Sequence, residues 1–126
     1  MLCVMRMLFD TTMAAVEKGL DGTAARQRAT AGNLANIETP GYRPRVVSFE
    51  EDLKRALAAE TRGEVGKGVE AVKPMTGDNE TGPMRLDGDA VDIEGEVATM
   101  GKNMLQHQAL LRLMGKKFDM MKMVMR

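Results

Sequence analysis

Apolar and small side chains recur with alternating four- and three-residue spacing in the first part of the chain. The recurring positions are Phe9, Met13, Val16, Leu20, Thr23, Gln27, Thr30, Leu34 and Ile37. This is the spacing of the a and d positions of a heptad, which line one side of an α-helix. It predicts a helix over about residues 7–37. The centre of its seam is polar, but Ala24 and Ala31 flank it and allow a partner to approach closely.

The same spacing returns in the last third and continues to the chain end. Its positions are Ile93, Val97, Met100, Met104, His107, Leu111, Met114, Phe118, Met121 and Met125. Asp92 is the expected N-cap of a helix over about residues 92–125, and the acidic start and basic end suit the helix dipole. A helix of this length runs roughly 50 Å, beyond any core that so short a chain can build. We therefore expect both seams to contact other helices.

Glycine weakens the first helix and dominates the middle of the chain. Gly19, Gly22 and Gly32 each cost about 1 kcal/mol relative to alanine inside a helix, so this helix needs packing partners. Ser48 followed by Glu51 predicts a capping box, and hence a turn and short helix over residues 38–60. Residues 61–90 hold many Gly, Pro and charged residues, which predicts a flexible loop.

These elements predict an all-α fold in a single domain over residues 1–126. Two long antiparallel terminal helices form a coiled-coil-like hairpin, with a short third helix and an irregular Gly-rich middle loop. The composition agrees, since the chain has 13 Met, 3 Phe, 1 Tyr and no Trp. Such a core is adaptable and suits helices that pack against several neighbours.

The balance of charge and the first ten residues limit the classes of function that the chain can have. The 18 basic and 18 acidic residues balance, which argues against a nucleic-acid partner. The single cysteine, Cys3, excludes an intramolecular disulfide. The first ten residues are too short and too soon interrupted for a secretory signal, and Met1, Met5 and Met7 are alternative starts. We expect a soluble chain, or one exported without signal cleavage.

Candidate chemistry is sparse. His107 has no nearby Cys or paired carboxylate, so we interpret it as a seam histidine rather than a metal ligand or catalyst. The methionines at 120, 121, 123 and 125 could ligate copper, but helical spacing favours core packing and Lys122 repels a cation. The acidic run of residues 50–52 lacks a partner base. The basic C-terminus is explained by the helix dipole without a membrane surface. We expect no catalytic, cofactor or metal site, no cofactor and no small-molecule substrate.

The most specific segment stands where the first helix must end. It comprises Asn33, Leu34, Ala35, Asn36, Ile37, Glu38, Thr39, Pro40, Gly41 and Tyr42. Pro40-Gly41 suits the centre of a type II turn, and a residue before proline avoids helical geometry, so the helix ends near Ile37 or Glu38. Asn33 and Asn36 are expected to cap the helix end or bind the adjoining loop.

This segment resembles the N-terminal signature of the flagellar rod and hook protein family, and residues 43–57 resemble the stretch that comes after that signature in the family. Asp87-Gly88 and Val91-Asp92 continue the resemblance, and so do Asn103-Met104-Leu105, Gln108-Ala109-Leu110, Lys117-Phe118 and Met121. Gly32, Gly95 and His107 depart from the family pattern. The resemblance implies a structural subunit of the basal-body rod, not an enzyme, that assembles helically in the periplasm, links the basal ring to the hook and transmits torque. It implies export by the flagellar apparatus without signal cleavage. The implied partners are copies of itself, other rod proteins, the rod-base adaptor and the MS ring.

Two alternatives stay open at this point. One is another short rod subunit of the same family, since the middle of the chain is its least specific part. The other is a soluble helical regulator or export chaperone that binds helices in its seams, which predicts a discrete folded dimer in dilute solution.

Overall fold

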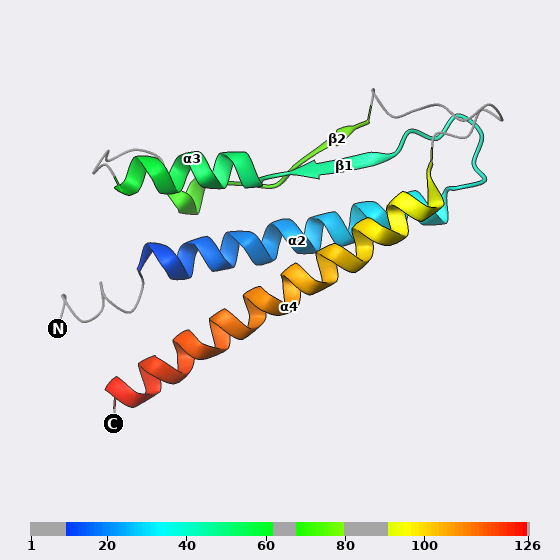
Figure 1. Cartoon of the computed structure of the whole chain (residues 1–126). Helices are drawn as coiled ribbons and strands as arrows, with labels where there is room; N and C mark the ends of the chain where they lie inside the picture. The colour runs from blue at the N-terminus through cyan, green and yellow to red at the C-terminus, as the bar shows by residue number, and fades with distance from the viewer. Residues whose placement is uncertain (1–9, 62–67, 80–90, 126) are drawn as a thin grey trace.

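The computed structural model describes residues 10–61, 68–79 and 91–125, which form an elongated molecule with α2 at its centre (Figure 1). In chain order the elements are α2 (Thr11–Ala35), β1 (Arg45–Ser48), α3 (Glu50–Thr61), the 3₁₀ turn η1 (Val69–Ala71), β2 (Met75–Asp78) and α4 (Ile93–Val124). Phe9, Cys3 and Asp87-Gly88, which the sequence analysis singled out, lie outside the described residues.

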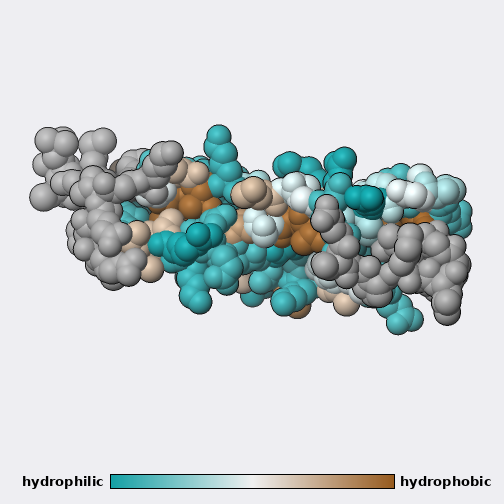
Figure 2. All heavy atoms as spheres, turned by 90° about the horizontal axis from the view of Figure 1, so that it is seen from above, coloured by the Kyte–Doolittle hydropathy of each residue, from teal (hydrophilic) through white to brown (hydrophobic). Residues whose placement is uncertain are grey.

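Two long helices dominate, as the heptad patterns predict. α2 and α4 run antiparallel and pack together, while α3 and the strands lie on the other side of α2 (Figure 1). The predicted all-α hairpin is confirmed, with one addition, a short two-stranded sheet. On the face that carries α3 and the strands, hydrophilic side chains dominate and apolar atoms show only as patches (Figure 2).

An aspartate stands at the N-cap of each long helix. The Asp10 carboxylate accepts a hydrogen bond from the Met13 amide at 2.9 Å, so α2 begins at Thr11, and residues 7–9 of the expected helix lie outside the described part. α2 ends at Ala35, before the expected Ile37, because Asn36 begins a turn. Asp92 is the N-cap residue of α4, as predicted, although its side chain makes no capping hydrogen bond.

The middle of the chain differs most from expectation. The predicted capping box is wrong, because Ser48 is the last residue of β1 and α3 begins at Glu50. The predicted loop over residues 61–90 contains η1 and β2, which pairs with β1 in antiparallel register from Arg45↔Asp78 to Ser48↔Met75. Four-residue strands are too short to show a period of two in the sequence.

The buried core is small and lies mostly between α2 and the sheet side. Its apolar residues are Val16, Val47, Phe49, Val69 and Val91. In the described part of α4, by contrast, the only fully buried residue is the polar Asn103. α2 therefore has partners on both sides, whereas α4 is covered on one side.

Candidate functional site

Asn33, in the last turn of α2, is the centre of a buried hydrogen-bond cluster. Its side-chain oxygen accepts from the Arg45 amide at 2.8 Å and from the Tyr42 hydroxyl at 3.2 Å. Its side-chain nitrogen donates to the Arg45 carbonyl at 3.0 Å and to Glu96 Oε1 at 2.9 Å. With 1% of its surface exposed, Asn33 uses its full hydrogen-bonding capacity. One side chain thus joins α2, the following turn, β1 and α4.

The segment from Asn33 to Tyr42 is called the signature segment here, and the rest of it forms the turn that follows α2. The Asn36 side chain donates to the Gly32 carbonyl at 2.8 Å and accepts from the Thr39 hydroxyl. The Tyr42 amide then bonds the Thr39 carbonyl at 3.2 Å, with Pro40 and Gly41 between them. Gly41 has φ of 75°, the positive value required at this position of a type II turn. Within the same segment Leu34 is half-buried, whereas Ala35 is exposed.

Arg26 is a second junction, one that the sequence reasoning missed. Its guanidinium forms an ion pair with Glu50 at the start of α3, donates to the Val47 carbonyl of β1 at 3.3 Å and lies 5.1 Å from the centre of the Phe49 ring. Partial burial raises the pKa of Glu50, but the hydrogen bond from Arg26 and its charge lower it further, so the pKa lies below its ordinary value. A single arginine in a polar helix segment carries no pattern that could have revealed this role.

Two glycines of α2 are positions of close approach. A Cβ at Gly22 would lie 2.5 Å from Phe49 Cγ, and one at Gly19 would lie 3.0 Å from a methyl carbon of Leu110. The Phe49 ring therefore packs directly on the α2 backbone, and Leu110 brings α4 close on the other side. The helix propensity lost at these glycines is offset by contacts that a side chain would block.

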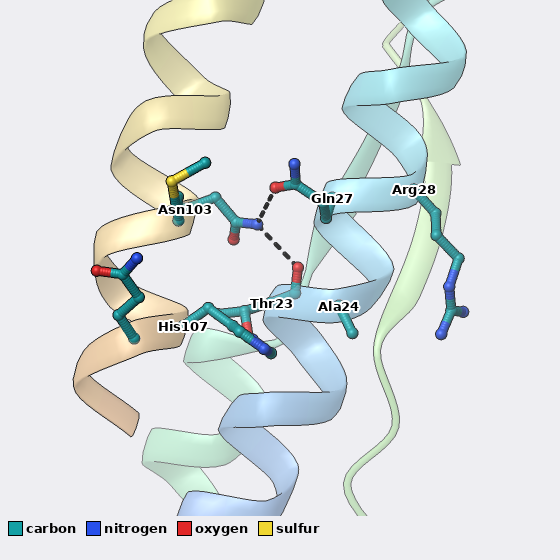
Figure 3. Close-up of a pocket in the computed structure, with 8 residues that line it drawn as sticks. Thr23, Ala24, Gln27, Arg28, Asn103 and His107 are labelled. Atoms are coloured by element: carbon teal, nitrogen blue, oxygen red, sulfur yellow. Dashed lines mark hydrogen bonds between the residues drawn. The ribbon is translucent and has the colours of Figure 1, made fainter. Parts of the chain in front are cut away.

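A polar layer lies in the middle of the α2–α4 interface (Figure 3). The Asn103 side-chain nitrogen donates to the Thr23 carbonyl at 2.8 Å and to Gln27 Oε1 at 3.0 Å. His107 Nδ1 and the Thr23 hydroxyl lie 2.7 Å apart. A groove of about 550 Å³ opens beside this layer and is lined by Thr23, Ala24, Gln27, Arg28, Asn103, Met104, His107 and Gln108.

The structure separates the α4 positions of the predicted assembly seam into two groups. Met100, His107, Met114 and Met121 are partly buried on one face. The same face includes the partly buried Leu110 and Lys117 and the buried Asn103, which the prediction left out. Ile93, Val97, Met104, Leu111, Phe118 and Met125 are 45–72% exposed. Five of these exposed residues follow one another at intervals of seven, and we call them the outer row: Val97, Met104, Leu111, Phe118 and Met125.

The α2 positions of that seam are placed differently. Val16 is buried, whereas Met13, Leu20 and Leu34 are half-buried, and Phe9 lies outside the described residues. α2 carries its large apolar side chains between two neighbouring layers, so it lacks an outer row like that of α4.

An ion pair joins the two helices where the hairpin is open. Lys117 Nζ lies 2.6 Å from Asp10 Oδ2. The hydrogen bond from Lys117 is the main reason that the pKa of Asp10 is lowered, and the Met13 amide adds to the effect, although burial opposes it. Asp10 therefore both caps α2 and holds α4.

The pH dependence of stability follows from the lowered pKa. The Asp10 contribution is present above the unfolded-state pKa of about 3.9 and is lost as the pH falls through the lower folded-state value. Asp10→Asn keeps the cap but removes the charge. We expect the variant to lose up to about 1 kcal/mol at pH 7, because the pair is partly solvated, and to match the unmutated chain near pH 2. Urea unfolding followed by circular dichroism measures both values, and an equal deficit at both pH values would contradict the assignment to charge.

The described residues were compared with the requirements of a metal site and of a membrane-spanning helix. Across residues 10–61, 68–79 and 91–125, no three His, Cys, Asp or Glu side chains come together as metal ligands. Of the C-terminal methionines, Met120, Met123 and Met125 are exposed and Met121 is half-buried. Within the same ranges, every helix is too short or too polar to cross a membrane.

Comparison with known proteins agrees with the signature segment, although no family model matches the chain. The flagellar basal body rod protein FlgB of Bacillus subtilis is 27% identical over 124 residues, which cover 94% of this chain and 95% of that protein. FlgB of Borrelia hermsii is 29% identical and covers 84% and 86%. FlgB of Escherichia coli is 29% identical and covers 81% and 83%. The matches span most of both proteins and the predicted helical hairpin is present, so the chain is similar over most of its length to the FlgB flagellar basal-body rod proteins.

Proposed function

We propose that this chain is a structural subunit of the flagellar basal-body rod. The observation that carries the proposal is the full-length similarity to proteins named for that role. The alignment with the Bacillus protein covers 94% of the chain, so it includes most of both long helices as well as the segment between them. A structural role without catalysis agrees with a chain whose polar clusters join elements of its own fold.

The outer row of α4 is the surface that we assign to assembly. Val97, Met104 and Leu111 are each more than half exposed, and Phe118 and Met125 extend the row towards the end of the helix. An apolar row at intervals of seven suits a further helix that lies along α4. Large exposed apolar surfaces of this kind mark protein interaction sites. The partners that we propose are copies of the chain, other rod proteins, and the adaptor and MS ring at the rod base.

The polar clusters suit a subunit that carries mechanical load. Asn33, Arg26 and Asp10 each join elements far apart in the sequence, so the α3 and sheet layer and α4 are both fixed to α2. A hairpin fixed at both ends and in the middle resists sliding of one helix along the other. We propose that helically assembled subunits use this rigidity to transmit torque between the basal ring and the hook.

The location follows from the same assignment. A rod subunit functions in the periplasm, and we propose that the flagellar export apparatus delivers this chain without cleaving a signal. The alternative, a soluble regulator or export chaperone, requires a discrete folded dimer in dilute solution. A different short rod subunit has less support, because the relatives described above all carry the FlgB name.

Deleting the gene tests the function in cells. We expect the deletion strain to lose swimming and to assemble no filaments, because a missing rod subunit leaves the hook without a base. A plasmid copy of the gene should restore both, which excludes an effect on neighbouring genes. Normal swimming of the deletion strain would contradict the proposal.

A further inference from the structure

The interface between α2 and α4 combines adaptable side chains with one costly polar layer. The partly buried face of α4 is formed mainly by Met100, Met114, Met121 and Leu110. Methionine is flexible and fits many surroundings, so such residues specify the register of two helices only weakly. A slip of one heptad towards the end of α2 would place Met121 beside Val16, so part of the interface would stay apolar.

Asn103 is the exception on this face. It is 2% exposed, and its side-chain oxygen has no hydrogen-bond partner among the described residues. A buried amide with an unsatisfied oxygen costs stability compared with an apolar side chain of similar size. The benefit of Asn103 must therefore lie elsewhere than in the stability of the hairpin.

We infer that Asn103, bonded to Gln27 and the Thr23 carbonyl, fixes the register of α4 along α2. As residue numbers rise along α2 they fall along α4, as the Asp10–Lys117, Gln27–Asn103 and Asn33–Glu96 pairs show. A slip of one heptad would move Asn103 from Gln27 to Leu34 in one direction or to Leu20 in the other. In either case the amide loses its side-chain acceptor and faces an apolar residue.

Other polar contacts do not exclude the slip towards Leu34. The same movement would bring Lys117 from Asp10 to Glu17, another acidic residue. It would bring His107 from Thr23 to Thr30, another threonine. Both contacts could form again with the same chemistry, whereas the Asn103 contact could not. The slip would also break the Asn33–Glu96 bond at the closed end of the hairpin and would move Leu110 from Gly19 to Arg26.

The inference concerns the fold of the subunit and does not rest on the proposed function. A buried asparagine that sets register at some cost in stability is a known device of paired helices. Here Asn103 would hold the outer row of α4 at a fixed position along α2, relative to the turn that follows α2. A slipped hairpin would present the same row about 10 Å out of place, since seven residues rise by about that distance.

Distances between spin labels test the register directly. In a Cys3→Ser background, cysteines replace the exposed residues Asp21 on α2 and Thr99 on α4, so that Glu17 stays available to Lys117. Because Asn103 lies beside Gln27, Thr99 lies at the level of residue 31, which is about 15 Å from Asp21 along the hairpin axis. The labelled chain is diluted tenfold into unlabelled chain. Double electron–electron resonance then reports distances between the two labels of one molecule, whether that molecule is free or assembled. The labelled chain in which Asn103 is unchanged should give a single distance.

The variants are Asn103→Met, the double variant with Glu96→Ala, and Met100→Leu as an apolar control on the same face. We expect Asn103→Met to keep or increase helical content and to add a second distance shifted by about 10 Å, with a larger share in the double variant. Met100→Leu should keep the single distance. An unshifted single distance in both Asn103 variants would overturn the inference. Loss of helical content in Asn103→Met would also overturn it, because Asn103 would then be a source of stability.

Discussion

Replacing Asn33 by leucine is expected to lower the free energy of unfolding by about 3 kcal/mol. Asn33 holds the amide and carbonyl of Arg45, the Tyr42 hydroxyl and Glu96. Leucine has a similar volume but leaves these groups without their partner in a buried site, where each unsatisfied group costs about 1–3 kcal/mol. Water that reaches part of the cluster reduces the total. Urea unfolding followed by circular dichroism, at a concentration where the chain is helical, measures the loss.

Two further variants separate the hydrogen bonds from the side-chain volume. Ala35→Leu adds the same side chain at an exposed position two residues away and should change stability by less than about 0.5 kcal/mol. Asn33→Asp keeps an acceptor for the Arg45 amide but places a carboxylate beside Glu96, so Glu96→Gln should recover part of its loss. Equal stability of Asn33→Leu and the unmutated chain would show that the cluster does not hold the helix end.

Replacing Gly22 by alanine is expected to destabilise the chain by about 2 kcal/mol, although alanine is the better helix former. The new Cβ would lie 2.5 Å from Phe49 Cγ, so the ring must move. The ring is 5% exposed, and Arg26 covers it, so it has little room. Its displacement also disturbs the ion pair between Arg26 and Glu50.

The matched control is Gly101→Ala on α4, where a Cβ meets nothing within 4 Å. It should stabilise the helix by up to about 1 kcal/mol. In the Gly22→Ala background, Phe49→Leu should recover part of the loss, because the smaller side chain leaves space. If both glycine variants stabilise the chain equally, Phe49 does not pack on α2 as described.

The helices were predictable because their pattern is long. Heptad spacing over more than twenty residues located α2 and α4, and the Asp92 cap placed the start of α4 within one residue. The two strands were not predictable, since four residues show no period and the pairing of β1 with β2 joins segments about thirty residues apart. The false capping box at Ser48 had the correct residue types, but pairing with Met75 placed Ser48 in a strand.

The candidate site was predictable only where residue type restricts geometry. Pro40-Gly41 permits few turns, so the turn could be predicted, whereas Arg26 is compatible with many roles. Gly19 and Gly22 were predicted only to weaken α2, because the residues that pack on them, Leu110 and Phe49, are remote in sequence. The heptad pattern could not show which seam positions face α2 and which form the outer row, because both groups are apolar.

The protein composition of purified hook–basal bodies shows whether this chain is a rod subunit that assembles through its outer row. In a deletion strain carrying the unmutated gene, Leu111→Glu in the outer row or Ala109→Glu on another exposed face, quantitative mass spectrometry measures the chain in the purified particles. We expect the unmutated chain and Ala109→Glu to be present in the particles, whereas Leu111→Glu should be strongly depleted although the variant is made. Absence of the unmutated chain from hook–basal bodies would contradict its assignment as a rod subunit, and normal incorporation of Leu111→Glu would contradict the role of the outer row.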